Sequence, residues 1–258
     1  MSLDLGQRLA VLLDLKESRL TIGGEETVIE GSRMSLSEMK GVLYNKQLET
    51  NTSAIAYYVF RRVALNEDLH LFDKSGVRYD ITVLPPSDWG GECPRTFGHV
   101  HQQAPTSQPE VFEVVEGKPH FLIQDTVRTG SIGIVEAEKG DKIVIPPDNL
   151  HLIINPSDQL IVASNLVLDT TIQDYEYVRR MRGAAYFELQ GRRFVRNQCY
   201  HGQCKIEFIY GNSQPQSQGV IFMKSRDKIY DLFTAKPETF DFLKGASQNR
   251  NENQLRAG

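Results

Sequence analysis

The chain lacks long hydrophobic runs. Its apolar stretches, such as 54–60, 150–154 and 160–163, are far shorter than the roughly 20 residues that a membrane-spanning helix needs. Residues 1–10 also lack the basic start, the apolar block and the small-residue cleavage site of a secretory signal. We therefore expect no contact with a membrane and a cytoplasmic location.

Cysteine and positive charge are also scarce. The three cysteines, Cys93, Cys199 and Cys204, are an odd number, which excludes a fully paired disulfide framework. None forms a CxxC pair, which argues against a zinc knuckle. The 29 lysines and arginines are outnumbered by 33 aspartates and glutamates, so the net charge is -4. Because no general positive field is present to attract nucleic acid, we expect no nucleic-acid partner.

What is present is the composition of a folded globular protein. Hydrophobic residues make up 40% of the 258 residues and charged residues 24%. Between residues 54 and 168, short apolar segments alternate with turn residues, and a helical period is almost absent. This pattern predicts a mainly β fold, an antiparallel sandwich or barrel. The expected strands are 54–63, 79–84, 95–101, 111–116, 120–125, 132–137, 142–145, 151–155 and 160–166.

A few peripheral helices are expected around the β-strands. Apolar residues at helical spacing predict an N-terminal helix over 5–16. Ser35 followed by Glu38 is a capping-box pattern, which predicts a short helix starting there. Near the other end of the chain, short helices are expected at 227–233 and 237–243.

Three histidines and one glutamate are candidate metal ligands. His99 and His101 alternate on an expected strand, so their side chains project from the same face. Glu110 opens the next strand after a loop that contains proline, and an antiparallel return would bring its carboxylate beside them. His151 begins another strand that can face the same barrel interior. Three imidazoles and one carboxylate suit one divalent ion of Fe, Mn, Ni or Zn, whereas HxH alone is also compatible with two solvent-facing histidines.

These residues belong to two longer patterns. An HxH pair followed by a glutamate and a glycine resembles the first cupin motif, here with a longer gap than usual before the glutamate. The residues concerned are His99, His101, Glu110 and Gly117. The second cupin motif matches except at Asp148, where the motif has a glycine. Its matching residues are Gly140, Pro146, His151 and Asn155. The resemblance implies a cupin barrel, a double-stranded β-helix of the jelly-roll type.

A narrower resemblance covers about residues 21–190. The segments ITVLPP, TFGHVH, PEVFEVVEGKPHFLIQ and VIPPDNLHLIIN resemble, in order, those of the cupin-type glucose-6-phosphate isomerase family. This implies a metal-dependent enzyme of glycolysis and gluconeogenesis that interconverts glucose 6-phosphate and fructose 6-phosphate, usually as a homodimer. We expect an N-terminal helical extension at 1–20, the isomerase domain at 21–190, and a C-terminal extension at 191–258 that packs on or flanks the barrel.

The resemblance also implies roles for individual residues. It assigns the metal ligands to His99, His101, Glu110 and His151. It assigns contacts with the substrate phosphate to Tyr57, Thr82, Thr96 and the backbone of Gly98. Tyr175 would help to fix the sugar, unless it is only a lid over the core. Leu168 and Gln173 stand where the family has an aromatic residue and a histidine, which leaves the preferred sugar phosphate open.

The expected chemistry needs a metal ion but no organic cofactor. A metal that coordinates the two reacting oxygens would polarise the carbonyl and acidify the adjacent C–H bond. If a proton moves through a cis-enediol, Glu110 is the candidate catalytic base. If hydride moves instead, Glu110 is only a ligand, and the sequence permits both routes.

Two other function classes use the same residues. A cupin dioxygenase would hold Fe(II) at these ligands and consume oxygen. A non-catalytic sugar-phosphate-binding protein would keep the barrel without turnover, and the replacements at Leu168 and Gln173 motivate this alternative. We rank both after the isomerase.

Overall fold

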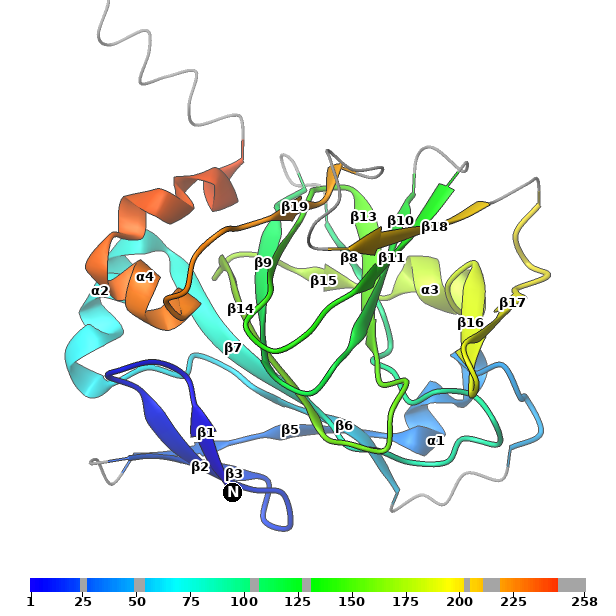
Figure 1. The fold of residues 1–258 in the computed structure, drawn as a ribbon, viewed down its shortest axis with the longest axis horizontal. Coiled ribbons are helices and arrows are strands. Elements are labelled where there is room, and N and C mark those ends of the chain that lie inside the picture. The colour runs from blue at the N-terminus through cyan, green and yellow to red at the C-terminus, as the bar shows by residue number, and fades with distance from the viewer. Residues whose placement is uncertain are drawn as a thin grey trace, which may run out of the picture.

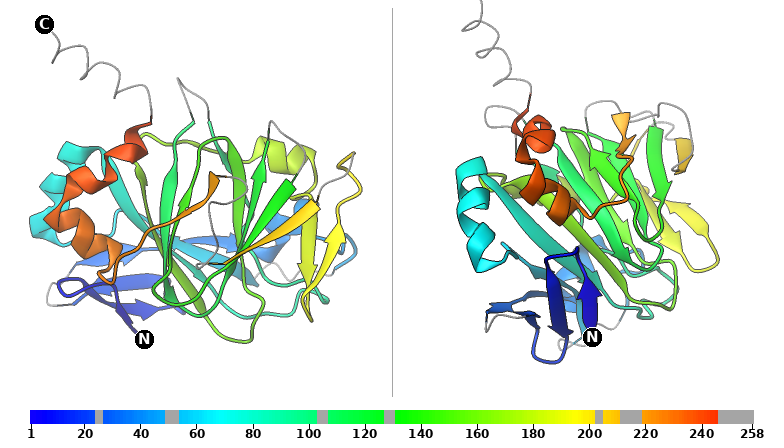
Figure 2. Two further views of the ribbon diagram at one scale, coloured as in Figure 1. Left: turned by 45° about the horizontal axis from the view of Figure 1, so that its top comes forward. Right: turned by 60° about the vertical axis from the view of Figure 1, so that its left-hand side comes forward.

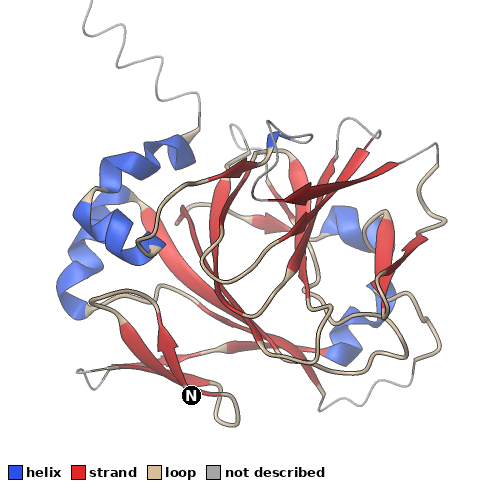
Figure 3. Ribbon diagram, viewed as in Figure 1, coloured by secondary structure: helices blue, strands red, loops and turns tan. Residues whose placement is uncertain are grey.

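The computed structural model describes residues 1–23, 27–48, 54–102, 107–126, 131–201, 205–210 and 219–245. Strands predominate among them, and the helices lie around the edges (Figure 1 and Figure 3). In this part of the chain, no helix is long and apolar enough to cross a membrane. Cys204 and residues 246–258, part of the expected C-terminal extension, lie outside the described residues.

Two sheets form the barrel. Their strand orders are β19-β12-β9-β14-β7-β6-β5 and β13-β10-β11-β18. The larger sheet contains β5 (Ser32–Ser35), β6 (Ile55–Phe60), β7 (Val77–Leu84), β9 (Glu110–Glu116), β12 (Lys142–Ile145), β14 (Ile161–Leu168) and β19 (Ile221–Phe222). The smaller sheet contains β10 (His120–Asp125), β11 (Ser131–Glu136), β13 (Asn149–Ile154) and β18 (Lys205–Tyr210). All pairs are antiparallel except β11 with β18, which is parallel. The predicted mainly β barrel is confirmed.

One expected strand is much shorter than predicted. Only β8 (Val100–His101) remains of the segment 95–101, where it pairs with β15 (Gln173–Asp174). Arg95 and His99 form isolated bridges with β13. Gly98 lies between them with a φ of 83°, a left-handed conformation that interrupts an extended strand.

The N-terminal helix expected over 5–16 is wrong. The region forms a separate antiparallel sheet of β1 (Ser2–Asp4), β2 (Ala10–Asp14), β3 (Arg19–Ile22) and β4 (Val28–Glu30). In β2, Val11 and Leu13 are buried while Leu12 is 56% exposed. The apolar residues therefore follow a period of two, and every second side chain of the strand packs on the larger sheet.

Two α-helices, a 3-10 helix and the N-terminal sheet cover the outer face of the larger sheet. The N-terminal sheet, α2 (Leu69–Ser75), α4 (Ile229–Ala235) and the 3-10 helix Pro237–Lys244 contribute to one hydrophobic core on that face (Figure 2). In this core, the ring of Phe72 lies 4.6 Å from that of Phe233. Because both faces of the sheet are covered, all eight residues of β7 are buried.

The remaining short elements largely follow the sequence pattern. Ser35 caps α1 (Leu36–Met39) through the expected capping box with Glu38, and a 3-10 turn, Lys40–Val42, continues it. The helix expected at 227–233 is α4, and the segment 237–243 is a 3-10 helix. The elements not yet placed are the 3-10 helix Asn66–Asp68, α3 (Glu176–Arg180), β16 (Tyr186–Leu189) and β17 (Arg193–Arg196).

A second core fills the space between the two sheets. Phe112 of β9 and Phe121 of β10 meet there with ring centroids 5.4 Å apart. Residues of β6, β7, β9, β13 and β14 also line a small polar cavity in the barrel. The candidate site is this cavity.

Candidate metal centre and its cavity

The structure brings the four predicted metal ligands together. One ligand atom from each of His99, His101, Glu110 and His151 lies within 4.8 Å of the others. His99 and His151 face each other across a short bridge, in which the His151 amide donates to the His99 carbonyl at 3.1 Å. Glu110 is the first residue of β9, as the sequence predicted.

Backbone groups orient two of the imidazoles. His101 donates its Nδ1–H to the Gln108 carbonyl at 2.6 Å, and His151 donates its Nδ1–H to the Asn149 carbonyl at 3.2 Å. Each bond holds the ring with its Nε2 atom directed to the cluster, which is how metal-binding histidines are usually fixed. Nε2 of His99 is buried and has no hydrogen-bond partner among the described residues. A buried nitrogen atom without a hydrogen-bond partner is suited to coordinate a cation.

The charge state of the cluster also suits a cation. Burial alone would raise the pKa of Glu110, but hydrogen bonds from His101 and His151 outweigh burial and lower that pKa below its usual value. The pKa of His99 is lowered well below its usual value by burial, and the two neighbouring histidines lower it further. An anionic carboxylate and a neutral imidazole are the forms that bind metal ions.

Both oxygens of the glutamate are engaged. Oε2 lies 3.0 Å from Nε2 of His151 and 3.3 Å from Nε2 of His101. Oε1 accepts a hydrogen bond of 2.6 Å from the side-chain amide of Asn165, on the neighbouring strand β14. Sequence reasoning missed Asn165, because it belongs to no motif.

The cluster opens onto a cavity of about 60 Å³. His99, Glu110 and His151 line it together with all five residues expected to bind the substrate, which are Tyr57, Thr82, Thr96, Gly98 and Tyr175. Arg61 and Asp80 also line it, and their contact with the cavity was not predicted. Gln173 lines it as well, at a position that the family resemblance places near the active site. Arg61 follows Tyr57 and Val59 at a spacing of two, and that strand period is a signal that would have found it.

Tyr175 lies over the cluster. Its ring packs edge-on against Phe97 at 5.5 Å and lies 5.8 Å from the His99 ring. Its hydroxyl donates to Oε1 of Gln173 at 2.7 Å. Burial raises the pKa of Tyr175, so the hydroxyl keeps its proton as a donor at neutral pH.

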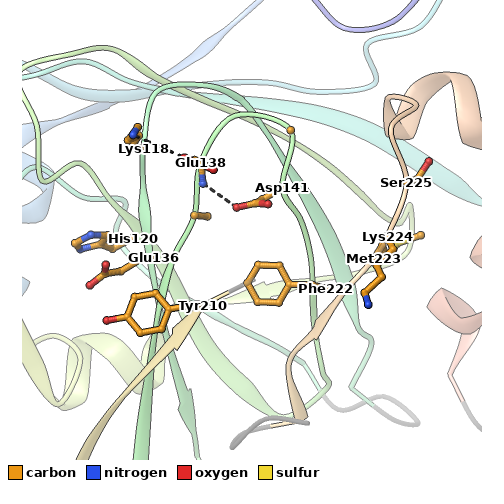
Figure 4. A pocket seen from close by; sticks show the side chains of 12 residues that line it. Lys118, His120, Glu136, Glu138, Asp141, Tyr210, Phe222, Met223, Lys224 and Ser225 are labelled. Atoms are coloured by element: carbon orange, nitrogen blue, oxygen red, sulfur yellow. Dashed lines mark hydrogen bonds and ion pairs between the residues drawn. The ribbon is translucent and has the colours of Figure 1, made fainter. Parts of the chain in front are cut away.

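A much larger hollow, of about 680 Å³, lies elsewhere, beside β11, β12, β18 and β19 (Figure 4). Lys118 pairs there with Glu138 at 3.7 Å, and His120 donates to the buried Glu188 at 2.9 Å. The metal-ligand cluster found in the described residues is not in this hollow. The groups suited to metal chemistry therefore lie in the smaller cavity.

Comparisons with known proteins give one family. A family model described as glucose-6-phosphate isomerase (GPI) matches residues 34–205, more than half of the chain. No curated protein matches the chain.

Several solved structures are similar to parts of the chain. A protein from Photorhabdus luminescens is 19% identical, with a TM-score of 0.31 over 43% of this chain and 73% of that one. A cupin-2 domain protein from Rhodospirillum rubrum is 10% identical, with a TM-score of 0.32 over 45% of this chain and 62% of that one. Oxalate decarboxylase from Bacillus subtilis is 15% identical, with a TM-score of 0.33 over 45% and 27%.

Proposed function

The chain belongs to the glucose-6-phosphate isomerase family, enzymes that interconvert glucose 6-phosphate and fructose 6-phosphate, and we propose that it carries out this reaction at one divalent metal ion held in the barrel. The observation that carries the proposal is the convergence of three imidazoles and one carboxylate, whose ligand atoms lie within 4.8 Å of one another beside the cavity. The proposed ligands are His99, His101, Glu110 and His151. Fe, Mn, Ni and Zn all suit this donor set.

The bound ion would supply Lewis-acid polarisation of the sugar carbonyl. If a proton moves through a cis-enediol, Glu110 would be the base; its lowered pKa keeps the carboxylate anionic at neutral pH and makes it a weaker proton acceptor. Asn165 holds Oε1 of that carboxylate and would fix its direction. If hydride moves between the two carbons instead, Glu110 acts only as a ligand. Turnover in D₂O separates the routes, because proton transfer exchanges the migrating hydrogen with solvent and a hydride shift does not.

The substrate phosphate is proposed to bind hydroxyl and backbone donors. Thr82, Thr96 and the Gly98 amide line the cavity wall, and each donor would make a charge-assisted hydrogen bond to a phosphate oxygen. Burial raises the pKa of Tyr57, so its phenol would also act as a neutral donor. Tyr175 is proposed to contact the sugar.

Metal reconstitution tests the proposal. Purified protein is stripped of metal, reloaded separately with Fe(II), Mn(II), Ni(II) and Zn(II), and assayed for conversion of fructose 6-phosphate to glucose 6-phosphate. We expect turnover that depends on the metal and is lost in His151→Ala. His70→Ala is the matched control, because His70 is exposed and bonds to a backbone carbonyl of its own helical turn.

Absence of turnover with every metal, in folded and metal-loaded protein, would overturn the proposal for this sugar pair. Oxygen consumption by the Fe(II) form would then favour a dioxygenase. Tight binding of glucose 6-phosphate without conversion would favour a non-catalytic sugar-phosphate-binding protein.

Two further proposals rest on the family resemblance. A homodimer is expected, and sedimentation at micromolar concentration would measure it. A cytoplasmic location suits an enzyme of glycolysis and gluconeogenesis, and cell fractionation would test it.

A further inference from the structure

Arg61 lies at the mouth of the metal cavity. It directly follows β6, where Tyr57 and Val59 precede it at alternate positions on the same face. Arg61 and Gln173 line both the inner cavity and a surface pocket of about 250 Å³. The side chain is exposed, so it borders solvent on one side and the cavity on the other.

Three arginines gather at this surface pocket, and their partners differ. Arg62 makes ion pairs with Asp73 and Asp169 at 2.5 and 2.6 Å. Arg78 pairs with Asp80 at 2.8 Å and also donates to two backbone carbonyls.

Arg61 has a weaker partner. Its guanidinium donates at 3.1 Å to the neutral amide oxygen of Gln173. Among the described residues, no carboxylate lies within ion-pair distance of it. Arg61 is therefore the arginine of this group whose charge is available to an anionic ligand.

The cavity offers no other permanent cation in the described part of its lining. Its carboxylates, Asp80 and Glu110, would repel a phosphate dianion. The positive charge of Arg61 acts within the same cavity. Burial raises the pKa values of Tyr57 and Tyr175, and the charge of Arg61 lowers both. A cation in this position offsets the carboxylates for an anionic substrate.

The resting cavity also has to open for a substrate. Its 60 Å³ is well below the roughly 300 Å³ of the smallest usual ligand pockets. Gln173 holds Arg61 and the Tyr175 hydroxyl on the same amide oxygen. A phosphate that bound the guanidinium fork would replace this neutral acceptor with a charged one and release Gln173.

We propose that Arg61 binds the phosphate of the substrate and selects phosphorylated over free sugars, exchanging its contact with Gln173 for one with the phosphate. The proposal deepens the proposed isomerase function and rests on it. Arg61 thereby adds a cation to the hydroxyl and backbone donors of the cavity wall.

Arg61→Gln tests the proposal in metal-loaded protein. A charged hydrogen bond of this kind is worth about tenfold to a hundredfold in affinity. We expect KM for fructose 6-phosphate to rise by that factor while kcat stays within about threefold. Isothermal titration with inorganic phosphate, which needs no turnover, should show the same loss of affinity. Arg61→Lys keeps the charge without the planar fork, and its phosphate affinity should lie between those of the wild type and Arg61→Gln.

Arg62→Gln is the matched control. It removes the same charge from the neighbouring residue, but Arg62 is occupied by Asp73 and Asp169. We expect unchanged phosphate affinity and KM. Far-UV circular dichroism and the thermal midpoint check that each variant is folded.

A separate variant leaves Arg61 in place. Gln173→Glu puts a carboxylate beside the guanidinium, which would compete with phosphate, so KM should rise while kcat is less affected.

Two results would overturn the proposal. One is unchanged affinity for inorganic phosphate in Arg61→Gln. The other is an equal fall in kcat/KM for fructose and fructose 6-phosphate, which would assign Arg61 to a sugar hydroxyl. Wild-type protein that binds inorganic phosphate through Arg61 but does not isomerise fructose 6-phosphate would support the anion contact while contradicting the proposed function.

Discussion

Asn165 is a positioning residue for Glu110. Its buried amide donates to Oε1 at 2.6 Å, on the side of the carboxylate away from the histidines. Asn165→Leu has a similar size but removes the donor. Because such supporting bonds typically contribute tenfold to a hundredfold to metal affinity, we expect the affinity for Mn(II), measured by chelator competition, to fall by about that factor.

Ser164→Ala is the control for this variant. Ser164 is the neighbouring residue on β14, and its side chain projects to the opposite face of the sheet. Its replacement should leave metal affinity unchanged. Equal metal affinity in Asn165→Leu and the wild type would contradict the positioning role.

Cys93 and Cys199 are predicted to differ in reactivity. Cys93 is 2% exposed, and burial, reinforced by the charges of Glu188 and Glu92, raises its pKa to about 12. The reactive thiolate is therefore almost absent at pH 8 and increases only as the pH approaches 12. Iodoacetamide at pH 8 should modify the half-buried Cys199 and leave Cys93 intact, as measured by site-resolved mass spectrometry.

Labelling in urea is the control, since both thiols should then react. Modification of Cys93 in the folded protein at the rate of Cys199 would contradict the prediction.

At the scale of elements, two glycine turns join the barrel strands under different constraints. Gly117 joins β9 to β10 with a φ of 83°, and an added Cβ would lie 2.7 Å from the Leu160 carbonyl oxygen. Gly140 joins β11 to β12 with a φ of 95° and has nothing within 4 Å of that position.

Replacement by alanine should separate the two constraints. Both variants incur the left-handed backbone strain, about 1–2 kcal/mol. Gly117→Ala adds overpacking of about 1–3 kcal/mol. We expect urea unfolding to show the larger loss of stability for Gly117→Ala, and equal losses would show that the backbone at this turn relaxes without cost.

The strand predictions succeeded where turn residues bound the segment on both sides. β12 has the predicted bounds, because Gly140 precedes it and Pro146 directly follows it. β10 also has them, with Pro119 directly before its first residue. The helix expected over 5–16 was wrong because closely spaced leucines fit a helical and a strand period, and only packing on the larger sheet selects between them. The segment 95–101 was overextended because its interruption depends on one backbone angle, at Gly98.

At the scale of the whole molecule, the C-terminal helices share a core with the barrel sheet. Tyr230 of α4 donates to Asp68 at 2.7 Å, and its oxygen accepts from the Leu65 amide at 3.0 Å. Phe233 is fully buried against Phe72 of α2. These contacts argue that α4 unfolds with the barrel, although the domain boundaries at residues 20 and 190 stay predictions.

Phe233→Ala tests that cooperativity. Removing a buried phenylalanine should lower the free energy of unfolding by about 3–5 kcal/mol. Near-UV and far-UV circular dichroism should report one common transition in urea. Two separate transitions would indicate that the C-terminal segment unfolds independently. Phe208→Ala, at a position 41% exposed on β18, is the control and should cost at most about 1 kcal/mol.

Local sequence patterns alone predict the metal-ligand chemistry of the site and the class of the fold. His99, His101, Glu110 and His151 were recognisable because ligand type, strand alternation and turn position are local properties. The same holds for the mainly β barrel, which follows from short apolar segments bounded by turn residues.

Which other residues reach the cavity, and what covers the sheet, depends on the packing of segments distant in sequence. Arg61 and Asn165 enter the site through the register of strands distant in sequence, and the N-terminal sheet and C-terminal helices meet on one apolar face. The pairing of strands distant in sequence is selected by the burial of a complete sheet face. Such a face is built from several strands, so no single segment of sequence specifies it.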